Sequence, residues 1–400
     1  MKKHLYLLFT IKRYIEQLVM FPFILIGKLY AILNPLHEQY DYFFFFPVYS
    51  IGGAERVNAE IVHAMNDRKI IIFFTKRSHN DGMLHFYQRP NVHIREIGKY
   101  ADNKFLYFLN LIWRGIISQY INTQAEKPTV FIGQCNFGYK LCPHINRRIK
   151  ITELIHVHEL KFLWVWAPFI RFIDTRVVIG DVFIKTFRQV HAEYGIPLKY
   201  IDNYKVIRYC LEYLPDTLIQ KNFQLPLRIY YAGRGGHQKR LWVLFRIIRK
   251  CNERGLPLHF SLAGPFQHEL PADLGENVSY YGELKGGEAM YNFHKKNDIL
   301  LMTSAFEGFP IVMLEAMSFG SPVIAPAVDA IPENIVHKQN GFIIQEHINE
   351  DKMVEEAVLI IESILAEKNH LAEISYNAYN TVKHKFSKEN FVRAYRELLI

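Results

Sequence analysis

The sequence has 400 residues, of which 50% are hydrophobic and 22% charged, as in a globular protein and unlike a disordered chain. Its net charge of +9 would suit nucleic acid, anionic lipid or a phosphorylated substrate. However, the basic residues are dispersed and no zinc-finger or RNP-like spacing occurs, so we expect no nucleic-acid partner. The four cysteines form no C-x-x-C pair, which favours reduced thiols in a cytosolic protein over a metal or disulfide role.

Residues 1–38 precede the first strand-like segment and are rich in apolar side chains. The apolar run 18–27 is too short to span a bilayer, and no small-residue cleavage site of a signal peptide follows it. Two interpretations fit. The segment is either an interfacial anchor, with lysine and arginine meeting anionic headgroups, or a helix packed on the body of the protein. We favour the anchor and expect a cytoplasmic protein, peripheral on the inner membrane surface.

From residue 40, strand-like and helix-like segments alternate. The segment 41–48 (DYFFFFPV) is continuous and apolar, as expected of a strand buried on both faces. A turn at Gly52-Gly53 follows, and then a helix is predicted over 54–66. Further strands are predicted at 70–75, 129–133, 151–157 and 177–179, with helices around 104–121 and after residue 179. This alternation predicts a parallel, doubly wound sheet.

Around 213–226 the pattern is interrupted by Pro215 and Pro226, and this stretch is interpreted as a linker. The alternation then restarts, with strands predicted at 227–232, 258–263, 278–281, 298–302 and 322–325 and helices at 241–254, 287–296 and 310–319. The last segment, 387–399, is amphipathic. The sequence therefore predicts an α/β protein with two Rossmann-like doubly wound domains, 39–212 and 227–385, facing a central cleft, and a C-terminal helix within 386–400 that packs back on the first domain.

One motif combines Glu307, Pro310, Glu315 and Gly320. Proline suits the first position of a helix and glycine the residue just past its end, so a helix is expected to begin at Pro310 directly after a strand. The free amides and dipole at such a helix start favour a phosphate. Two carboxylates beside a phosphate need hydroxyl donors, which a ribose or a hexose offers. The alternative is that both are solvated surface glutamates.

A second motif, Gly233-Arg234-Gly235-Gly236 followed by Lys239, comes after a predicted strand. The glycines permit close backbone approach, while Arg234 and Lys239 offer two positive charges to a diphosphate. A glycine-rich turn alone could also belong to a dinucleotide fingerprint, but neither G-x-G-x-x-G nor the Walker pattern occurs.

These motifs, in this order, resemble the retaining GT-B glycosyltransferases of the large "group 1" family, over residues 40–398. The resemblance rests on Gly52-Gly53-Ala54-Glu55-Arg56, Gly233-Arg234 and Lys239, Glu307 and Glu315, Pro332-Glu333 and Asn340-Gly341. It implies that Arg234 and Lys239 hold the diphosphate of a nucleoside diphosphate sugar and stabilise it as it departs. It assigns sugar contacts to Glu307 and the amides beside Pro310, namely those of Phe309 and Ile311, and ribose contacts to Glu315. Gly52, Gly53 and Gly233 would face the donor, and no metal or other cofactor is expected.

The segment 155–159 (IHVHE) ends a predicted strand of the first domain. The resemblance places a histidine followed by an acidic residue near the reacting sugar, which His158-Glu159 fits better than His156. Strand alternation puts both histidines on the same face, so His156 remains a rival. Either could instead be a core histidine, and a zinc site lacks further ligands nearby.

The sequence differs from the pattern of the family in three places. Residues 206–212 (VIRYCLE) lack the asparagine-glycine usually found at the end of the first domain. Arg240 stands where a glycine usually follows the lysine, and Asp329-Ala330 replace two glycines before Pro332-Glu333. The expected reaction is transfer of a sugar, with retention, from a nucleoside diphosphate to a glycan or lipid-linked acceptor in cell-surface glycan synthesis. The alternatives are a nucleotide-sugar epimerase of the same fold and a non-catalytic, membrane-bound partner protein.

Overall fold

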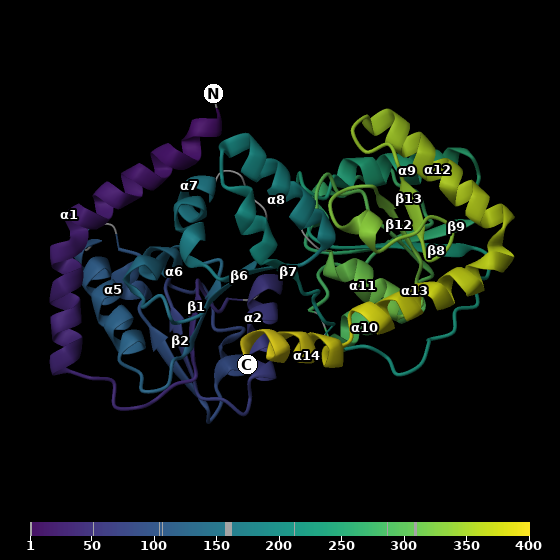
Figure 1. Cartoon of the computed structure of the whole chain (residues 1–400). Coiled ribbons are helices and arrows are strands. Elements are labelled where there is room, and N and C mark those ends of the chain that lie inside the picture. Colours follow the sequence, from purple (N-terminus) through teal and green to yellow (C-terminus); the bar gives the residue numbers. More distant parts are fainter. Residues whose placement is uncertain are drawn as a thin grey trace. The chain divides into compact units, whose positions relative to one another are not determined.

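The computed structural model describes residues 2–50, 52–103, 105, 107–156, 162–211, 213–285, 287–307 and 310–400. The chain forms two compact units, drawn in Figure 1. Unit 1 comprises Met1–Tyr209 together with Phe391–Ile400, and unit 2 comprises Cys210–Asn390.

Within the described residues, unit 1 contains a seven-stranded parallel sheet of order β3-β2-β1-β4-β5-β6-β7. Its strands are β1 (Tyr42–Phe46), β2 (Ile70–Phe74), β3 (Val92–Glu96), β4 (Thr129–Gly133), β5 (Ile151–Ile155), β6 (Thr175–Val178) and β7 (Tyr204–Val206). Its helices are α1 (Leu5–Leu33), α2 (Gly53–Ala64), α3 (Leu84–Tyr87), α4 (Gly98–Ala101), α5 (Tyr107–Asn122), α6 (Asn136–Leu141), α7 (Leu163–Trp166) and α8 (Asp181–Tyr194). All five residues of β1 are buried, because helices cover both faces of a doubly wound sheet.

Unit 2 repeats this plan with a six-stranded parallel sheet, again within the described residues, of order β10-β9-β8-β11-β12-β13. Its strands are β8 (Leu227–Ala232), β9 (Leu258–Ala263), β10 (Val278–Tyr280), β11 (Ile299–Leu301), β12 (Val323–Pro326) and β13 (Phe342–Ile344). Its helices are α9 (Leu241–Glu253), α10 (Gly287–Lys296), α11 (Ile311–Ser318), α12 (Glu350–Ala366) and α13 (Leu371–Lys385). The prediction of two Rossmann-like, doubly wound domains is confirmed.

The stretch 213–226, predicted as a linker, is instead part of unit 2. Phe223 is buried in its core, and the hydroxyl of Tyr379 on α13 donates to the carbonyl of Pro215 at 2.9 Å. Lys221 is also buried, and its ammonium donates to the carbonyls of His294 and Asn297 at the end of α10. The prolines interrupt regular structure here, but the apolar and cationic side chains between them still find partners in the unit.

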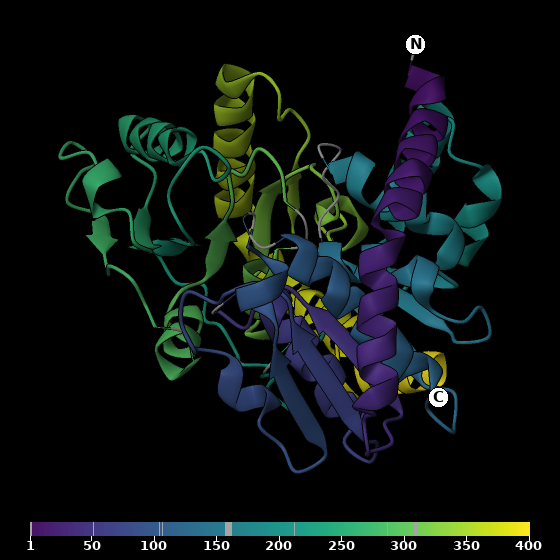
Figure 2. The same cartoon turned by 90° about the vertical axis from the view of Figure 1, so that its left-hand side faces the viewer.

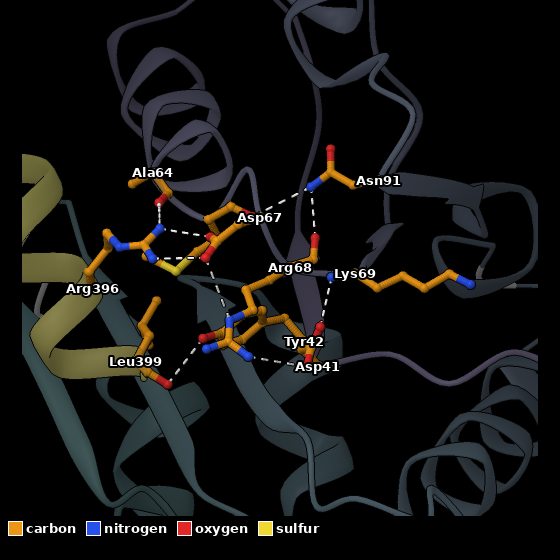
Figure 3. Close-up of polar contacts among 10 residues, drawn as sticks. Asp41, Tyr42, Ala64, Asp67, Arg68, Lys69, Asn91, Arg396 and Leu399 are labelled. Carbon is orange, nitrogen blue, oxygen red and sulfur yellow. Dashed lines mark hydrogen bonds and ion pairs between the residues drawn. The ribbon is translucent and has the colours of Figure 1, made fainter.

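The end of the chain belongs to unit 1 through the helix α14 (Lys388–Leu399), as Figure 3 shows. The guanidinium of Arg396 makes a fork with the carboxylate of Asp67, at 2.7 and 2.8 Å, and donates to the carbonyl of Ala64 at the end of α2. The hydroxyl of Tyr42 donates to the carbonyl of Leu399 at 3.2 Å. These contacts bind the last turns of α14 beside the amino end of β1.

The helix α1 lies along unit 1, beside α5 (Figures 1 and 2). The two backbones meet at two glycines. A Cβ on Gly27 would lie 2.0 Å from the carbonyl oxygen of Ile112, and one on Gly115 would lie 2.1 Å from that of Ile24. At its other end the ammonium of Lys2 pairs with Glu193 of α8 at 2.5 Å. The helix is therefore held on the unit near both of its ends.

The polarity of α1 is inverted relative to an ordinary surface helix. Its inward residues include Arg13 and Glu16, which pair at 2.5 Å, whereas its outward face is apolar except for Lys12. The exposed large apolar side chains are Leu7, Leu8, Ile11, Tyr14, Ile15, Leu18, Val19, Phe21, Phe23, Leu25, Ile26, Leu29, Tyr30, Ile32 and Leu33. The segment Lys2–Leu33 is long and apolar enough to cross a bilayer. The expectation that the apolar segment is too short rested on the run 18–27 alone, which is only part of this helix.

We expect Gly115→Ala to lower the free energy of unfolding by about 1–3 kcal/mol, because the added methyl group would push α1 away from α5. Urea denaturation monitored by circular dichroism measures the change. The control is Leu25→Ala on α1, whose side chain is exposed and should change stability by less than about 0.5 kcal/mol. Equal effects of the two substitutions would contradict the close glycine contact.

Candidate functional site

The loop between β8 and α9 carries Gly233, Arg234 and Lys239 and is tied to its neighbours by backbone contacts. The amide of Gly233 donates to the carbonyl of Ala263 at the end of β9. A Cβ on Gly264 would lie only 1.8 Å from the carbonyl oxygen of Gly233, so these two loops require glycine at their crossing. The close crossing fixes where the loop leaves the sheet.

Arg240, where the family usually has glycine, adopts a left-handed conformation with φ of 47°. This backbone geometry favours glycine, and here the arginine side chain offsets its cost. The buried guanidinium donates to the carbonyls of Thr303 and Ser304, at 2.8 and 3.0 Å, and to that of His347 at 2.9 Å. Arg240 thus joins the loop after β8 to the loop after β11, and this contact holds the backbone next to Lys239 in place.

Lys239 and Glu307 form the central contact of the site. The ammonium of Lys239 lies 2.5 Å from Oε1 of Glu307, and the hydroxyl of Ser304 donates to the same oxygen at 2.6 Å. Glu307 is 5% exposed, and its backbone amide donates to the carboxylate of Asp329 at 2.6 Å. In the described part of the chain Oε2 of Glu307 has no partner. One carboxylate oxygen is therefore fixed, and the other is open to a hydrogen-bond donor.

Arg234 lies on the exposed side of the same loop. Its carbonyl accepts from the hydroxyl of Tyr231 at 2.7 Å, while its guanidinium makes no hydrogen bond or ion pair with the described residues. Burial raises the pKa of the Tyr231 phenol, Glu307 raises it further, and Arg234 lowers it. Arg234 and Glu307 therefore act electrostatically on one hydroxyl group. An unpaired guanidinium beside a lysine is suited to a phosphate.

The helix α11 begins at Ile311, and Pro310 is its N-cap with φ of −77° and ψ of 96°. The expectation that Pro310 occupies the first helical position is therefore wrong by one residue. The extended ψ explains this, because a residue in that conformation precedes the helix. Gly320 follows the last turn with φ of 72°, as predicted for the residue past the helix end. The amide of Ile311 is thus one of the first free donors of α11.

Glu315, one turn into α11, is half-buried beside His294 of α10. Its Oε2 lies 3.7 Å from Nε2 of His294, whose Nδ1 is 2.7 Å from the hydroxyl of Tyr230. Burial raises the pKa of Tyr230, so that hydroxyl stays protonated and donates to Nδ1. Nε2 of His294 is buried and makes no hydrogen bond with the described residues. His294, Ser304 and Asp329 were not among the predicted site residues. In the sequence Asp329 stands out only as the replacement of a glycine, and nothing in the sequence context marks His294 or Ser304.

Several predicted residues lie apart from this cluster or outside the described residues. Phe309 and the histidine His158 fall outside them. Gly52 and Gly53 belong to unit 1, where Gly52 is the N-cap of α2 and Gly53 its first residue. Among the described residues, no group of three or more histidine, cysteine, aspartate or glutamate side chains could hold a metal ion.

His156, the rival histidine, is buried at the end of β5. Its Nδ1 lies 2.8 Å from the hydroxyl of Tyr209, and its Nε2 lies 3.2 Å from Oδ1 of Asn58. Burial lowers the pKa of His156 to about 4, so the ring is neutral at physiological pH. With both nitrogens occupied by protein groups, His156 fits the interpretation as a core histidine.

The comparisons with known proteins agree with the motifs in unit 2. Residues 219–381 match the family described as "Glycosyl transferases group 1". Unit 2 is a group 1 glycosyltransferase domain. This confirms the family that the sequence motifs predicted.

Two curated relatives match mainly one part of the chain. An uncharacterised 41.2 kDa protein in the cps region of Klebsiella pneumoniae is 28% identical over 43% of this chain and 46% of its own length. An uncharacterised glycosyltransferase of Methanocaldococcus jannaschii is 28% identical over 41% of this chain and 42% of its own length. The chain thus spans less than half of each of these relatives.

Two solved structures match both units. Anabaena HepE in complex with UDP and glucose has a TM-score of 0.68 at 17% identity, covering 90% of this chain and 99% of that one. The lipopolysaccharide outer core galactosyltransferase WaaB in its apo form has a TM-score of 0.67 at 18% identity, with the same coverage. At this identity the likeness establishes the fold, which is that of the GT-B glycosyltransferases.

The ion pair of Lys239 and Glu307 should contribute measurably to the stability of unit 2. We expect Lys239→Met to cost about 3 kcal/mol, because it leaves a buried carboxylate without its cation. The double variant Lys239→Met with Glu307→Gln should regain at least half of this loss, since it removes the uncompensated charge. Urea denaturation of the two single variants and the double variant measures the coupling. Additive losses would show that the two side chains do not interact.

Proposed function

We propose that the protein is a retaining glycosyltransferase that moves a sugar from a nucleoside diphosphate sugar to an acceptor hydroxyl. The observation that carries the proposal is the buried carboxylate of Glu307, held at one oxygen by Lys239 and open at the other, with the unpaired guanidinium of Arg234 on the same loop as Lys239. Cations suit a diphosphate, and an open carboxylate oxygen suits a sugar hydroxyl. HepE, whose structure contains UDP and glucose, shares the fold.

In the proposed reaction the bond between the anomeric carbon and the diphosphate oxygen breaks, while the acceptor oxygen bonds to that carbon on the same face. The proton of the acceptor hydroxyl passes to the departing diphosphate. Negative charge thus develops on the leaving group, where Arg234, Lys239 and the first amides of α11 stabilise it. These groups account for the charge with no metal ion, so we propose a metal-independent transferase. Glu315, beside His294, would accept from the ribose hydroxyls.

Arg234→Gln should reduce kcat by about 10²–10³, the usual loss when one preorganised charged donor is removed from a developing negative charge. Its side chain is exposed, so the fold should be unchanged. Release of the nucleoside diphosphate is measured with UDP-, GDP- and ADP-sugars and a lipid-linked saccharide extract. The matched control is Arg249→Gln, on α9, which should retain full turnover. Near-normal turnover by Arg234→Gln would overturn the mechanism.

We also propose that the protein lies on the cytoplasmic face of a membrane and acts on a lipid-linked acceptor. The support is the inverted polarity of α1, whose charged residues Arg13 and Glu16 face inward while fifteen large apolar side chains are exposed. Water penalises such a face, whereas acyl chains accept it. Because α1 is packed along the unit, only its outer face is free, which favours a helix lying in the membrane surface over one that spans the bilayer. The free thiols of the four cysteines fit a reducing compartment.

The double substitution Leu18→Glu with Val19→Glu should release the protein from vesicles, because it places two charges on the outer face of α1. Flotation with vesicles of phosphatidylcholine and phosphatidylglycerol measures the bound fraction, which we expect to fall at least about tenfold. The control Leu359→Glu changes an exposed apolar residue of α12 in unit 2 and should float like the unaltered protein. Equal flotation of all three proteins would contradict the surface anchor.

A further inference from the structure

Unit 1 contains a cavity of about 470 Å³ at the carboxyl ends of its strands. Pro47, Thr75 and Gln134, which directly follow β1, β2 and β4, lie at its base, and side chains of α5, α6 and α7 form its walls. In open α/β sheets this edge is the preferred place for a ligand. The volume is in the range of small-ligand pockets. All of its described lining residues belong to unit 1.

Two cations of this cavity have no carboxylate within ion-pair distance among the described residues. Burial lowers the pKa of Arg114, and the charge of Glu16 acts against this effect. Arg114 is 5% exposed, and its contacts are with the neutral side chains of Tyr107 and Asn110. Its Nε is buried and makes no hydrogen bond with the described residues. Lys140 is half-buried and stands 5.7 Å from the centre of the Tyr107 ring. In the described part of the chain neither cation forms an ion pair. Buried charges are normally paired, so the two cations point to an anion that arrives with a ligand.

The electrostatics of Tyr107 report the same excess of positive charge. Burial raises the pKa of its phenol, but Arg114 and Lys140 outweigh this effect and the net pKa is lowered. Burial lowers the pKa of Lys140, and the charge of Arg114 lowers it further. Lys76 adds a third positive charge to the lining, against the single carboxylate of Asp102 among the described lining residues. The cavity is therefore cationic, with a net charge that an anion would balance.

The apolar side of this cavity adjoins α1. Phe162 and Trp164, both nearly half exposed, line the cavity, and the guanidinium of Arg13 stacks on the Trp164 ring at 5.2 Å. Tyr107, Arg114 and Lys140 also line a small neighbouring cavity, which is closed on its other side by Arg13 and Glu16 of α1. The cationic cavity thus lies directly behind the helix whose outer face is apolar.

We propose that this cavity binds the phosphate or diphosphate group of a lipid-linked acceptor, with Arg114, Lys140 and Lys76 as its anion contacts and Phe162 and Trp164 against the adjoining lipid. The assignment rests on the proposed function, in that the bound lipid is the acceptor of the transferred sugar. Arginine offers a planar fork that matches phosphate oxygens, and lysine adds point charges. A lipid held by α1 at the membrane surface would present its headgroup at this depth.

The probe is farnesyl diphosphate, a short lipid diphosphate, titrated against the full chain. Trp164 and Trp166 line the cavity, so intrinsic fluorescence reports binding there. Lys140→Gln should weaken farnesyl diphosphate binding at least about tenfold and leave UDP binding unchanged. Lys239→Met should weaken UDP binding and leave farnesyl diphosphate binding unchanged. The second variant is Lys76→Gln, at an exposed position, which should weaken farnesyl diphosphate binding several-fold and leave the fold unchanged. The control is Lys127→Gln, at the opposite edge of the sheet before β4.

The comparison ligands separate the possible sources of the anion. Farnesol should bind at least about tenfold more weakly than farnesyl diphosphate, and so should inorganic pyrophosphate, because the cavity combines cations with an apolar wall. Equal binding of farnesol, or of pyrophosphate, would overturn a site for a lipid phosphate. Farnesyl diphosphate binding that survives both Lys140→Gln and Lys76→Gln, or that is lost in Lys239→Met, would also overturn it. A chain that binds farnesyl diphosphate as expected but fails to bind any nucleoside diphosphate would refute the proposed function and leave the cavity assignment standing.

Discussion

Parallel pairing of neighbouring strands is the constraint on which the site in unit 2 depends. β8 pairs with β11 and β11 with β12, and all three run in the same direction, so the loops that leave them start at one edge of the sheet. Lys239 follows β8, Glu307 follows β11 and Asp329 follows β12, although the chain separates them widely. Their contacts at 2.5 and 2.6 Å are a direct result of that strand order. A different order of the same strands would scatter the three side chains.

The carboxylate of Glu307 lies at the same edge of the sheet, and the free-energy cost of burying its charge has to be offset. Glu307 is nearly inaccessible, and an unpaired charge there would be strongly unfavourable. Lys239 and Ser304 satisfy one oxygen, and Asp329 fixes the backbone of the same residue, so the position of the side chain is set before any ligand binds. Such preorganisation lowers the cost of orienting a substrate. The open oxygen is then the natural contact for a donor hydroxyl, while Arg234 remains available to an anion.

The sequence predicted most of this frame because long apolar strands and glycine turns leave a clear local signal. β1, β2 and β8 are near-continuous apolar runs, and their predicted bounds differ from the structure by at most two residues at either end. The strands that were missed carry a weaker signal: β3 (VHIRE) is a half-exposed edge strand, and β7 and β13 have three residues each. The contacts of Arg240 and Asp329 were not predictable either. Both adopt positive φ where glycine is usual, and their side-chain partners come from distant loops.

The inverted helix α1 and the cationic cavity of unit 1 have one physical explanation in common. On the inward side of α1, Arg13 pairs with Glu16 of the same helix and donates to the carbonyl of Trp164 on the unit. Arg13 and Glu16 line one small cavity with Arg114 and Lys140, and these two cations form no ion pair with the described residues. Around α1 the outer face is thus mainly apolar, and the cavity just behind the helix is positive. A molecule with an apolar chain and an anionic head has the complementary order, and a soluble sugar or a free nucleotide has not. The distribution of charge around α1 therefore favours an amphiphilic acceptor over a soluble one.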